Sequence, residues 1–140
     1  MQFLQNLTEF MANHYWLTLA FMVVLVLLII TEGRKAGAAV STQQATALIN
    51  RENALVVDVR PKKDYAAGHI VDSINIPQDS FATRMGELEK YKTRPIILTC
   101  ANGQHAGPCS KQLKAAGYTQ VSRLASGIGG WRSDNLPLVK

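Results

Sequence analysis

The first quarter of the chain carries its longest run of apolar positions. Residues 10–31, FMANHYWLTLAFMVVLVLLIIT, hold no Asp, Glu, Lys or Arg, and a helix needs about 20 such residues to cross the hydrocarbon core of a bilayer. Between Leu17 and Ile30 only Thr18 is polar, so a helix here has no side suited to water. The pattern predicts an N-terminal segment, residues 1–35, that contains one transmembrane helix.

After residue 35, short apolar runs alternate with helical patterns. Residues 54–59 (ALVVDV) and 94–100 (RPIILTC) contain continuous apolar runs, which are typical of strands buried on both faces of a sheet. This alternation predicts one α/β domain, residues 36–140, with a central parallel sheet between two helical layers. Further strands are expected at the start of residues 39–50 and at 73–77 and 119–124, and helices after a Ser41 or Thr42 cap and at 61–68, 81–92 and 106–117.

Charge is distributed unevenly along the chain and orients the predicted span. All 15 Lys and Arg residues lie from Arg34 onward, and Arg34 and Lys35 follow the apolar run directly. By the positive-inside rule, the N-terminus faces outward and the domain stays in the cytoplasm. The alternative is a cleaved signal peptide with its cleavage site at Ala36–Ala38, but the residues before the run lack the Lys or Arg of such a peptide.

The charge and residue types of the domain limit the classes of partner that it is expected to bind. Residues 34–140 hold 15 basic and 8 acidic residues, a formal charge of +7, which favours anionic neighbours such as phospholipid head groups or small anions. No basic run is interleaved with aromatic residues, so no nucleic-acid partner is expected. The chain has two cysteines and lacks the dense cysteine spacing of a disulfide-stapled scaffold, which fits a reducing compartment. His and Cys residues do not occur at zinc-binding spacing, so no metal site is expected.

Cys100 stands where an apolar strand gives way to small polar residues. Ligands of parallel sheets bind at the carboxyl ends of the strands, and Cys100 lies at that end of its strand, before the loop ANGQHAG and a predicted helix. Backbone N–H groups in such a loop, together with the helix dipole, stabilise a thiolate, the nucleophilic form of cysteine. From the residues alone, a nucleophile and a small buried side chain remain equally good interpretations.

Three ordered stretches resemble the rhodanese-like domains, and the resemblance covers about residues 40–131. They are VVDVRPKKDYAAGHIVDSINIP (residues 56–77), IILTCANGQHAG (96–107) and LASGIGGW (124–131). The resemblance implies a three-layer rhodanese-like fold and a bacterial inner-membrane sulfurtransferase without a cofactor. In this reaction Cys100 takes the outer sulfur of a donor such as thiosulfate as a persulfide and passes it to a thiophilic acceptor.

The resemblance also implies a binding loop for the persulfide, and this chain departs from its usual pattern. Active members commonly carry Arg five residues after the cysteine, followed by Ser or Thr, where this chain has His105 and Ala106. His105 could replace the Arg as a weaker, pH-dependent cation or could be a solvated loop residue. We therefore expect weak activity, and the alternative function is a membrane-tethered binding or adaptor module. The predicted loop residues are Ala101, Asn102, Gly103, Gln104, His105 and Ala106.

Other residues of the resemblance are expected to support the site. The resemblance implies that Asp58 and Arg60 form a structural ion pair and that His69 is a hydrogen-bonded scaffold residue. It also implies that Trp131 packs in the core near the loop. Cys109 could resolve an oxidised Cys100 as a disulfide or could fill the core. The expected partners are a small sulfur-containing anion or persulfide donor, the membrane and a membrane protein held near by the anchor.

Overall fold

A computed structural model of the chain describes residues 1–35 and 37–140. The chain divides into two compact units, Met1–Arg34 and Lys35–Lys140, which are described separately. The chemistry predicted from the sequence falls in the second unit.

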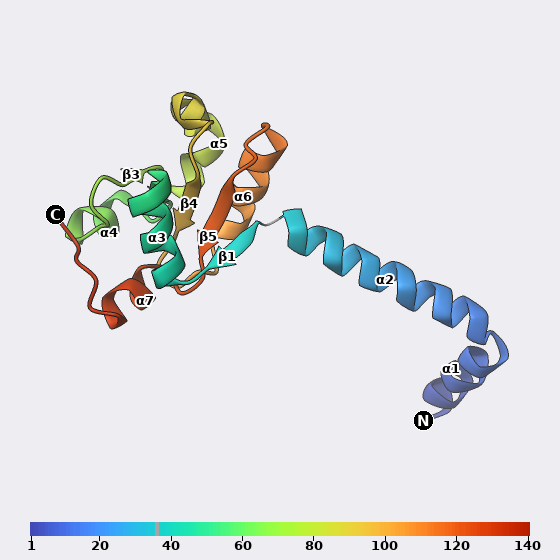
Figure 1. Ribbon diagram of the computed structural model, residues 1–140. Helices are drawn as coiled ribbons and strands as arrows, with labels where there is room; N and C mark the ends of the chain where they lie inside the picture. Colours follow the sequence, from blue (N-terminus) through green and yellow to red (C-terminus); the bar gives the residue numbers. More distant parts are fainter. Residues whose placement is uncertain (36) are drawn as a thin grey trace. The chain divides into compact units, whose positions relative to one another are not determined.

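The first unit consists of two helices with a break between them (Figure 1). Helix α1 is Gln2–Asn13 and helix α2 is Tyr15–Lys35. His14 interrupts them with φ −123° and ψ 43°, outside the α-helical region. Phe10–Asn13, which the sequence pattern included in the predicted span, therefore belong to α1. By length and composition, the stretch Tyr15–Glu32 of α2 could cross a membrane.

The second unit contains a five-stranded parallel sheet with the order β1-β5-β4-β2-β3. Its strands are β1 Ala38–Val40, β2 Leu55–Asp58, β3 Ile74–Asn75, β4 Ile96–Thr99 and β5 Val121–Leu124. The helices are α3 Thr42–Glu52, α4 Lys62–Ala67, α5 Phe81–Arg84, α6 Ala106–Ala115 and α7 Gly127–Ser133, with 3-10 turns η1 Gln78–Ser80 and η2 Met85–Tyr91.

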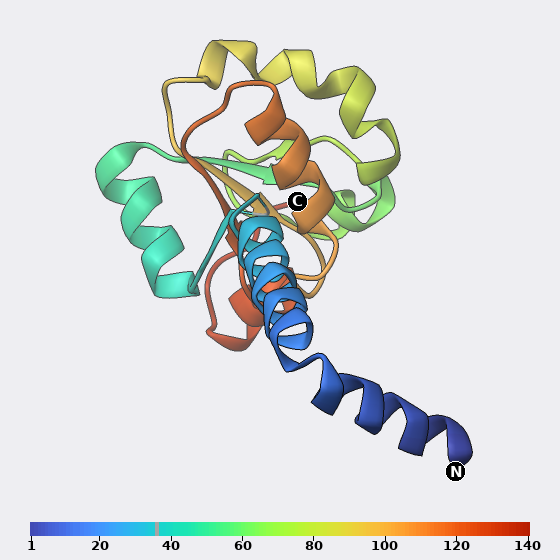
Figure 2. The same ribbon diagram turned by 90° about the vertical axis from the view of Figure 1, so that its right-hand side faces the viewer.

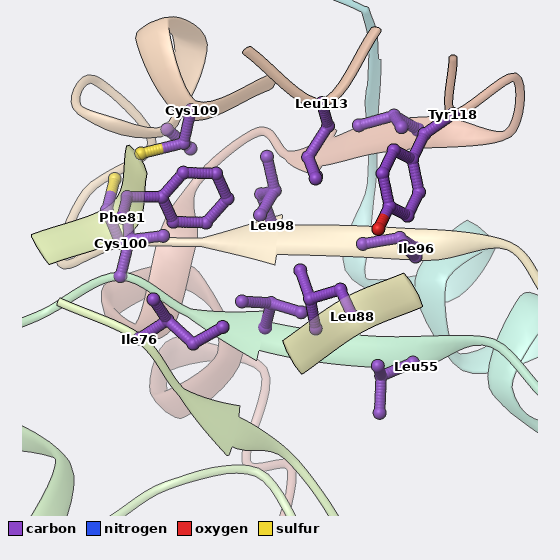
Figure 3. Packing of buried hydrophobic residues seen from close by; sticks show 14 residues of the cluster. Leu55, Ile76, Phe81, Leu88, Ile96, Leu98, Cys100, Cys109, Leu113 and Tyr118 are labelled. Carbon is purple, nitrogen blue, oxygen red and sulfur yellow. The ribbon is translucent and has the colours of Figure 1, made fainter. Parts of the chain in front are cut away.

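The helices form a layer on each face of the sheet (Figures 1 and 2). One apolar cluster joins the sheet to α5, η2 and α6 through Phe81, Leu88 and Leu113 (Figure 3). A second cluster lies on the opposite face and includes Ala45 of α3 and Trp131 of α7. The predicted three-layer α/β architecture is confirmed.

Local sequence signals account for several helix ends. The Ser41 hydroxyl accepts a hydrogen bond from the N–H of Gln44, and the Gln44 side chain accepts one from the N–H of Ser41, which is a capping box at the start of α3. Pro61 precedes α4 and Gly68 follows it. Gly117, with φ +95°, follows α6.

Two segments differ from the sequence expectation. Residues 81–92, predicted as a helix, form the single α-helical turn α5 followed by the 3-10 turn η2. Helix α7 was not predicted, because its glycines are weak helix formers. It forms where its first N–H groups find carbonyl partners in the loop after β4.

Candidate active site

Cys100 follows the last residue of β4, and its side chain is almost fully buried, with 1% exposed. Its Sγ accepts hydrogen bonds from the backbone N–H groups of Gly103, at 3.0 Å, and His105, at 3.3 Å. Both donors lie in the loop that leads into α6. Two N–H groups directed at one sulfur, next to a helix N-terminus, stabilise negative charge on it. The arrangement fits a thiolate or the persulfide formed from it.

The loop after Cys100 depends on a backbone shape that only glycine takes easily at one position. Gly103 has φ +89°, and a Cβ added there would collide with the carbonyl oxygen of Ala125. The amide of Gly103 thus reaches the sulfur because the chain passes close against the end of β5. Gly103 is a shape-determining residue of the candidate site.

The first turn of α7 binds the same loop through backbone hydrogen bonds. The N–H of Ile128 donates to the carbonyl of Cys100 at 2.9 Å, and the N–H of Gly129 donates to that of Ala101 at 2.9 Å. Gly127 has φ +60°, and a Cβ there would lie 2.8 Å from the amide nitrogens of Asn102 and Gly103. Sequence reasoning noted the GIGG stretch only as a family signature and missed this supporting role.

The other residues between Cys100 and α6 differ in their exposure to solvent. Ala101, Asn102, Gln104 and His105 are exposed, whereas Ala106 is fully buried as the first residue of α6. The N–H of Gln104 donates to Asn102 Oδ1 at 3.3 Å, which gives the loop an internal bond. The His105 imidazole therefore lies on the exposed side of the loop while its backbone N–H contacts the sulfur.

Asp58 and Arg60 form a buried ion pair at the carboxyl end of β2. The Arg60 Nη2 donates to Asp58 Oδ2 at 2.8 Å and to the Gly68 carbonyl at 2.8 Å, and the Asp58 carboxylate also accepts from Arg60 Nε and N–H. Asn75 Nδ2 donates to the carbonyls of Asp58 and Arg60. Each charged group has its partners within the scaffold, and the pair ties β2 to the end of α4 and to β3.

His69 and Trp131 each make contacts with the scaffold of the domain. The His69 ring stacks on Tyr65 at 3.8 Å between ring centroids, and its Nδ1 lies 2.9 Å from the Tyr65 carbonyl. Trp131 Nε1 donates to the Pro137 carbonyl at 3.0 Å, and its ring packs in the cluster on the face opposite Cys100. Among the residues that the structure describes, no group of three or more His, Cys, Asp or Glu could hold a metal ion.

Cys109 lies in α6 and packs in the same apolar cluster as Cys100 and Phe81 (Figure 3). Burial, reinforced by the electrostatic influence of the neighbouring Cys100, raises the pKa of the Cys109 thiol to about 11. The two thiols thus differ in chemistry. Cys100 accepts two backbone hydrogen bonds, whereas Cys109 is held as a neutral thiol.

An open polar hollow of about 740 Å³ lies at the start of α3 and includes none of the predicted site residues. Within it the Thr42 hydroxyl donates to the Asp134 carboxylate, so these two groups are already paired. The chemistry predicted from the sequence is concentrated at Cys100 instead. The hollow is lined by Ser41, Thr42, Gln43, Thr46, Asp134 and Leu136.

Most of the chain is similar to known proteins. Residues 41–134 match the rhodanese-like domain family. The chain is 37% identical to protein YibN of Escherichia coli strain K12, over 98% of this chain and 99% of YibN. It is 32% identical to a sulfurtransferase of Allochromatium vinosum, over 66% of this chain and 84% of that protein.

The fold agrees with these sequence matches. A crystal structure of a rhodanese-related protein from Thermoplasma volcanium superposes with a TM-score of 0.63 and 24% identity, over 73% of this chain and 97% of that one. The predicted family is therefore confirmed by sequence and by fold. The chain belongs to the rhodanese-like domain family.

Proposed function

We propose that this protein is a membrane-anchored sulfurtransferase that carries sulfane sulfur as a persulfide on Cys100. The observation that carries the proposal is the pair of backbone N–H groups, from Gly103 and His105, directed at the Cys100 sulfur. Such donors stabilise a thiolate before the reaction and a persulfide anion after it. The sulfurtransferase name of the Allochromatium relative supports the same chemistry.

The reaction divides into two displacements at sulfur. The Cys100 thiolate attacks the outer sulfur of thiosulfate, a new S–S bond forms, and the original S–S bond breaks as sulfite leaves with its electron pair. An acceptor thiolate, or cyanide in an assay, then attacks the terminal sulfur of the persulfide and restores the Cys100 thiolate. Neither step requires an external oxidant or reductant, because each is a nucleophilic displacement at sulfur.

We further propose that α2 anchors the domain in the inner membrane. The stretch Tyr15–Glu32 is long and apolar enough to span, and the basic residues Arg34 and Lys35 follow it. The positive-inside rule places the rhodanese-like domain in the cytoplasm and the N-terminus outside. Anchoring raises the local concentration of the domain next to membrane-protein partners.

Turnover of thiosulfate and cyanide by the full chain in detergent micelles tests the catalytic proposal. We expect thiocyanate to form with the wild type, to fall to the background rate with Cys100→Ser, and to persist with the matched variant Cys109→Ala. A Cys100→Ser variant that keeps the wild-type rate would show that the reaction does not pass through this sulfur.

A second candidate, a binding or adaptor module, is favoured by the loop that lacks Arg and a hydroxyl residue. His105 lies on the exposed side of the loop, Ala106 is buried, and the thiol itself is only 1% exposed. This candidate predicts a folded protein whose Cys100 takes up sulfur neither from thiosulfate nor from a low-molecular-weight persulfide. Uptake from the persulfide alone would instead indicate a sulfurtransferase with a different donor.

A further inference from the structure

The apolar residues of α1 lie on one face of the helix and are exposed, although the Phe10 ring also contacts the His14 ring at 4.8 Å between centroids. At 100° per residue, five apolar side chains fall within an arc of roughly 120°. Their exposed fractions range from 43% to 76%, so the face is open along its whole length. These residues are Phe3, Leu4, Leu7, Phe10 and Met11.

The break at His14 turns this face toward the start of α2. The His14 N–H donates to the Phe10 carbonyl at 3.0 Å, and the His14 carbonyl accepts from the N–H groups of Leu17, at 3.0 Å, and Thr18, at 3.1 Å. The corner is therefore hydrogen-bonded on both sides. A hollow of about 420 Å³ opens between the two helices and is lined by Leu7, Phe10, Met11, Leu17, Thr18, Phe21 and Met22.

The walls of this hollow suit hydrocarbon rather than water or a polar ligand. Thr18 is the single polar residue of the lining, and its hydroxyl donates to the His14 carbonyl at 3.3 Å. A hydroxyl bonded to a nearby backbone carbonyl does not need another partner, which is the condition that a hydrocarbon environment imposes. The hollow therefore fits an acyl chain.

The charge of the segment decides which kind of membrane surface it fits. Residues 1–33 contain no Lys or Arg, and Glu9 is the one acidic residue in α1. Binding through anionic head groups would require basic residues on the polar face. A neutral, zwitterionic interface has no such requirement, and the polar face of α1 offers mainly the amides of Gln2, Gln5, Asn6 and Asn13.

We propose that α1 lies in the bilayer interface at the N-terminal end of α2, with its apolar face and the hollow filled by acyl chains of that leaflet. The inference rests on the proposed span, because a single residue joins α1 to Tyr15 and Trp16, whose amphipathic rings favour the interface. A helix of 12 residues is about 18 Å long, so α1 stays close to the surface at which α2 enters.

Spin labels in the full chain, reconstituted in phosphatidylcholine vesicles, test this proposal. Native cysteines are removed as Cys100→Ser and Cys109→Ala, and single cysteines are introduced along residues 2–13 and, as a reference, residues 20–28. Accessibility to oxygen, which concentrates in lipid, is compared with accessibility to a water-soluble nickel chelate. We expect the oxygen-to-nickel ratio to oscillate with a helical period in α1, with maxima at Leu7 and Met11 and minima at Gln5 and Glu9.

Failure of the α1 proposal is distinguishable from failure of the proposed span. High nickel accessibility throughout residues 2–13, with low values at 20–28, would remove α1 from the interface and leave the span intact. High nickel accessibility at 20–28 as well would overturn both. Labels at Leu7 and Met11 that are protected from both reagents and broadened by a second label nearby would assign the face to a second copy of the chain instead.

A matched pair of charge substitutions adds a second test. Leu7→Asp places a carboxylate on the apolar face, whereas Asn6→Asp places the same charge next to it on the polar face. With the label at position 11, we expect the nickel accessibility to rise several-fold for Leu7→Asp and to stay unchanged for Asn6→Asp. Equal responses to the two substitutions would overturn the proposal.

Discussion

The backbone N–H of Ile128 donates a hydrogen bond to the carbonyl oxygen of Cys100 at 2.9 Å. The residue that bears the candidate nucleophile is thereby attached to α7, an element that follows it by more than twenty residues. Because the next N–H of α7 bonds to Ala101, the helix fixes the beginning of the loop whose later amides contact the sulfur. The geometry at Cys100 depends on this contact between α7 and the loop after β4.

Gly127→Ala tests that dependence. The residue has φ +60°, and its new Cβ would lie 2.8 Å from the amide nitrogens of Asn102 and Gly103. Strain at such a position costs about 1–3 kcal/mol, and displacement of the loop should slow persulfide formation by at least about tenfold. The matched control is Gly86→Ala, where a Cβ meets nothing within 4 Å. Urea denaturation gives the free energy of unfolding of each variant, and a kinetic assay gives its rate of sulfur uptake. Equal stabilities and equal rates for Gly127→Ala and Gly86→Ala would contradict the role of α7.

His105→Arg tests whether the missing cation limits activity. Arg is permanently charged and offers a planar fork of donors for an anionic substrate, which an imidazole does not. We expect sulfur uptake from thiosulfate to become several-fold faster in His105→Arg. Gln104→Arg adds the same charge at the neighbouring exposed position and serves as the control. If both variants speed the reaction equally, the effect is general electrostatic attraction and position 105 has no special role.

Asp58→Asn tests the buried ion pair. Removal of the carboxylate leaves the Arg60 side chain, 7% exposed, without its counter-charge, and such a loss typically costs about 3–5 kcal/mol. Glu87→Gln breaks the exposed pair between Arg84 and Glu87 and should cost far less, because water and salt screen exposed ion pairs. The free energies of unfolding of the two variants should differ accordingly. Similar values for both would show that the buried pair contributes no more than a surface pair.

Cys109 provides a prediction about pH. Burial raises its pKa from an ordinary value of 9.0 to about 11, so between these values the unfolded thiol releases its proton while the folded one keeps it. The contribution to stability is complete below about pH 9 and is lost as the pH rises through about 11. One pKa unit corresponds to about 1.4 kcal/mol, so the loss amounts to a few kcal/mol at most.

The comparison of wild type with Cys109→Ala isolates this contribution from the tyrosines and lysines that titrate in the same range. The free energy of unfolding of the variant should fall less steeply between pH 9 and 11. Parallel curves for the two proteins would show that the Cys109 thiol ionises as freely in the folded state as in the unfolded one. The proposed role of Cys109 as a resolving thiol would then gain support, because a thiolate is the attacking form.

Hydrophobic periodicity was sufficient to predict the parallel sheet. The apolar run at residues 94–100 contains β4, and Cys100 lies at its carboxyl end as expected. Periodicity does not report backbone conformation, however. The small residues and glycines of the loop, rather than periodicity, led us to expect N–H groups directed at the Cys100 sulfur, and Gly103, with φ +89°, donates such a bond. His14 breaks the N-terminal helix without a Pro or Gly to mark the position.

Helix α7 also could not be predicted from the local sequence pattern. Its glycines predict a loop by local propensity, and the helix exists because its first amides bond to the carbonyls of Cys100 and Ala101. Such tertiary contacts lie outside any local sequence pattern. The sequence could not predict how α7 holds the loop after β4, because the two segments are distant along the chain.

Intact-mass spectrometry after incubation with thiosulfate tests the central claim most directly. Full-length protein, reduced and then freed of reductant, should gain the mass of one sulfur atom, and the gain should disappear on addition of cyanide. Cys109→Ala should behave like the wild type, and Cys100→Ser should gain no mass. A sulfur adduct that persists in Cys100→Ser and is lost in Cys109→Ala would contradict the account, because the sulfur would then be carried by the other cysteine.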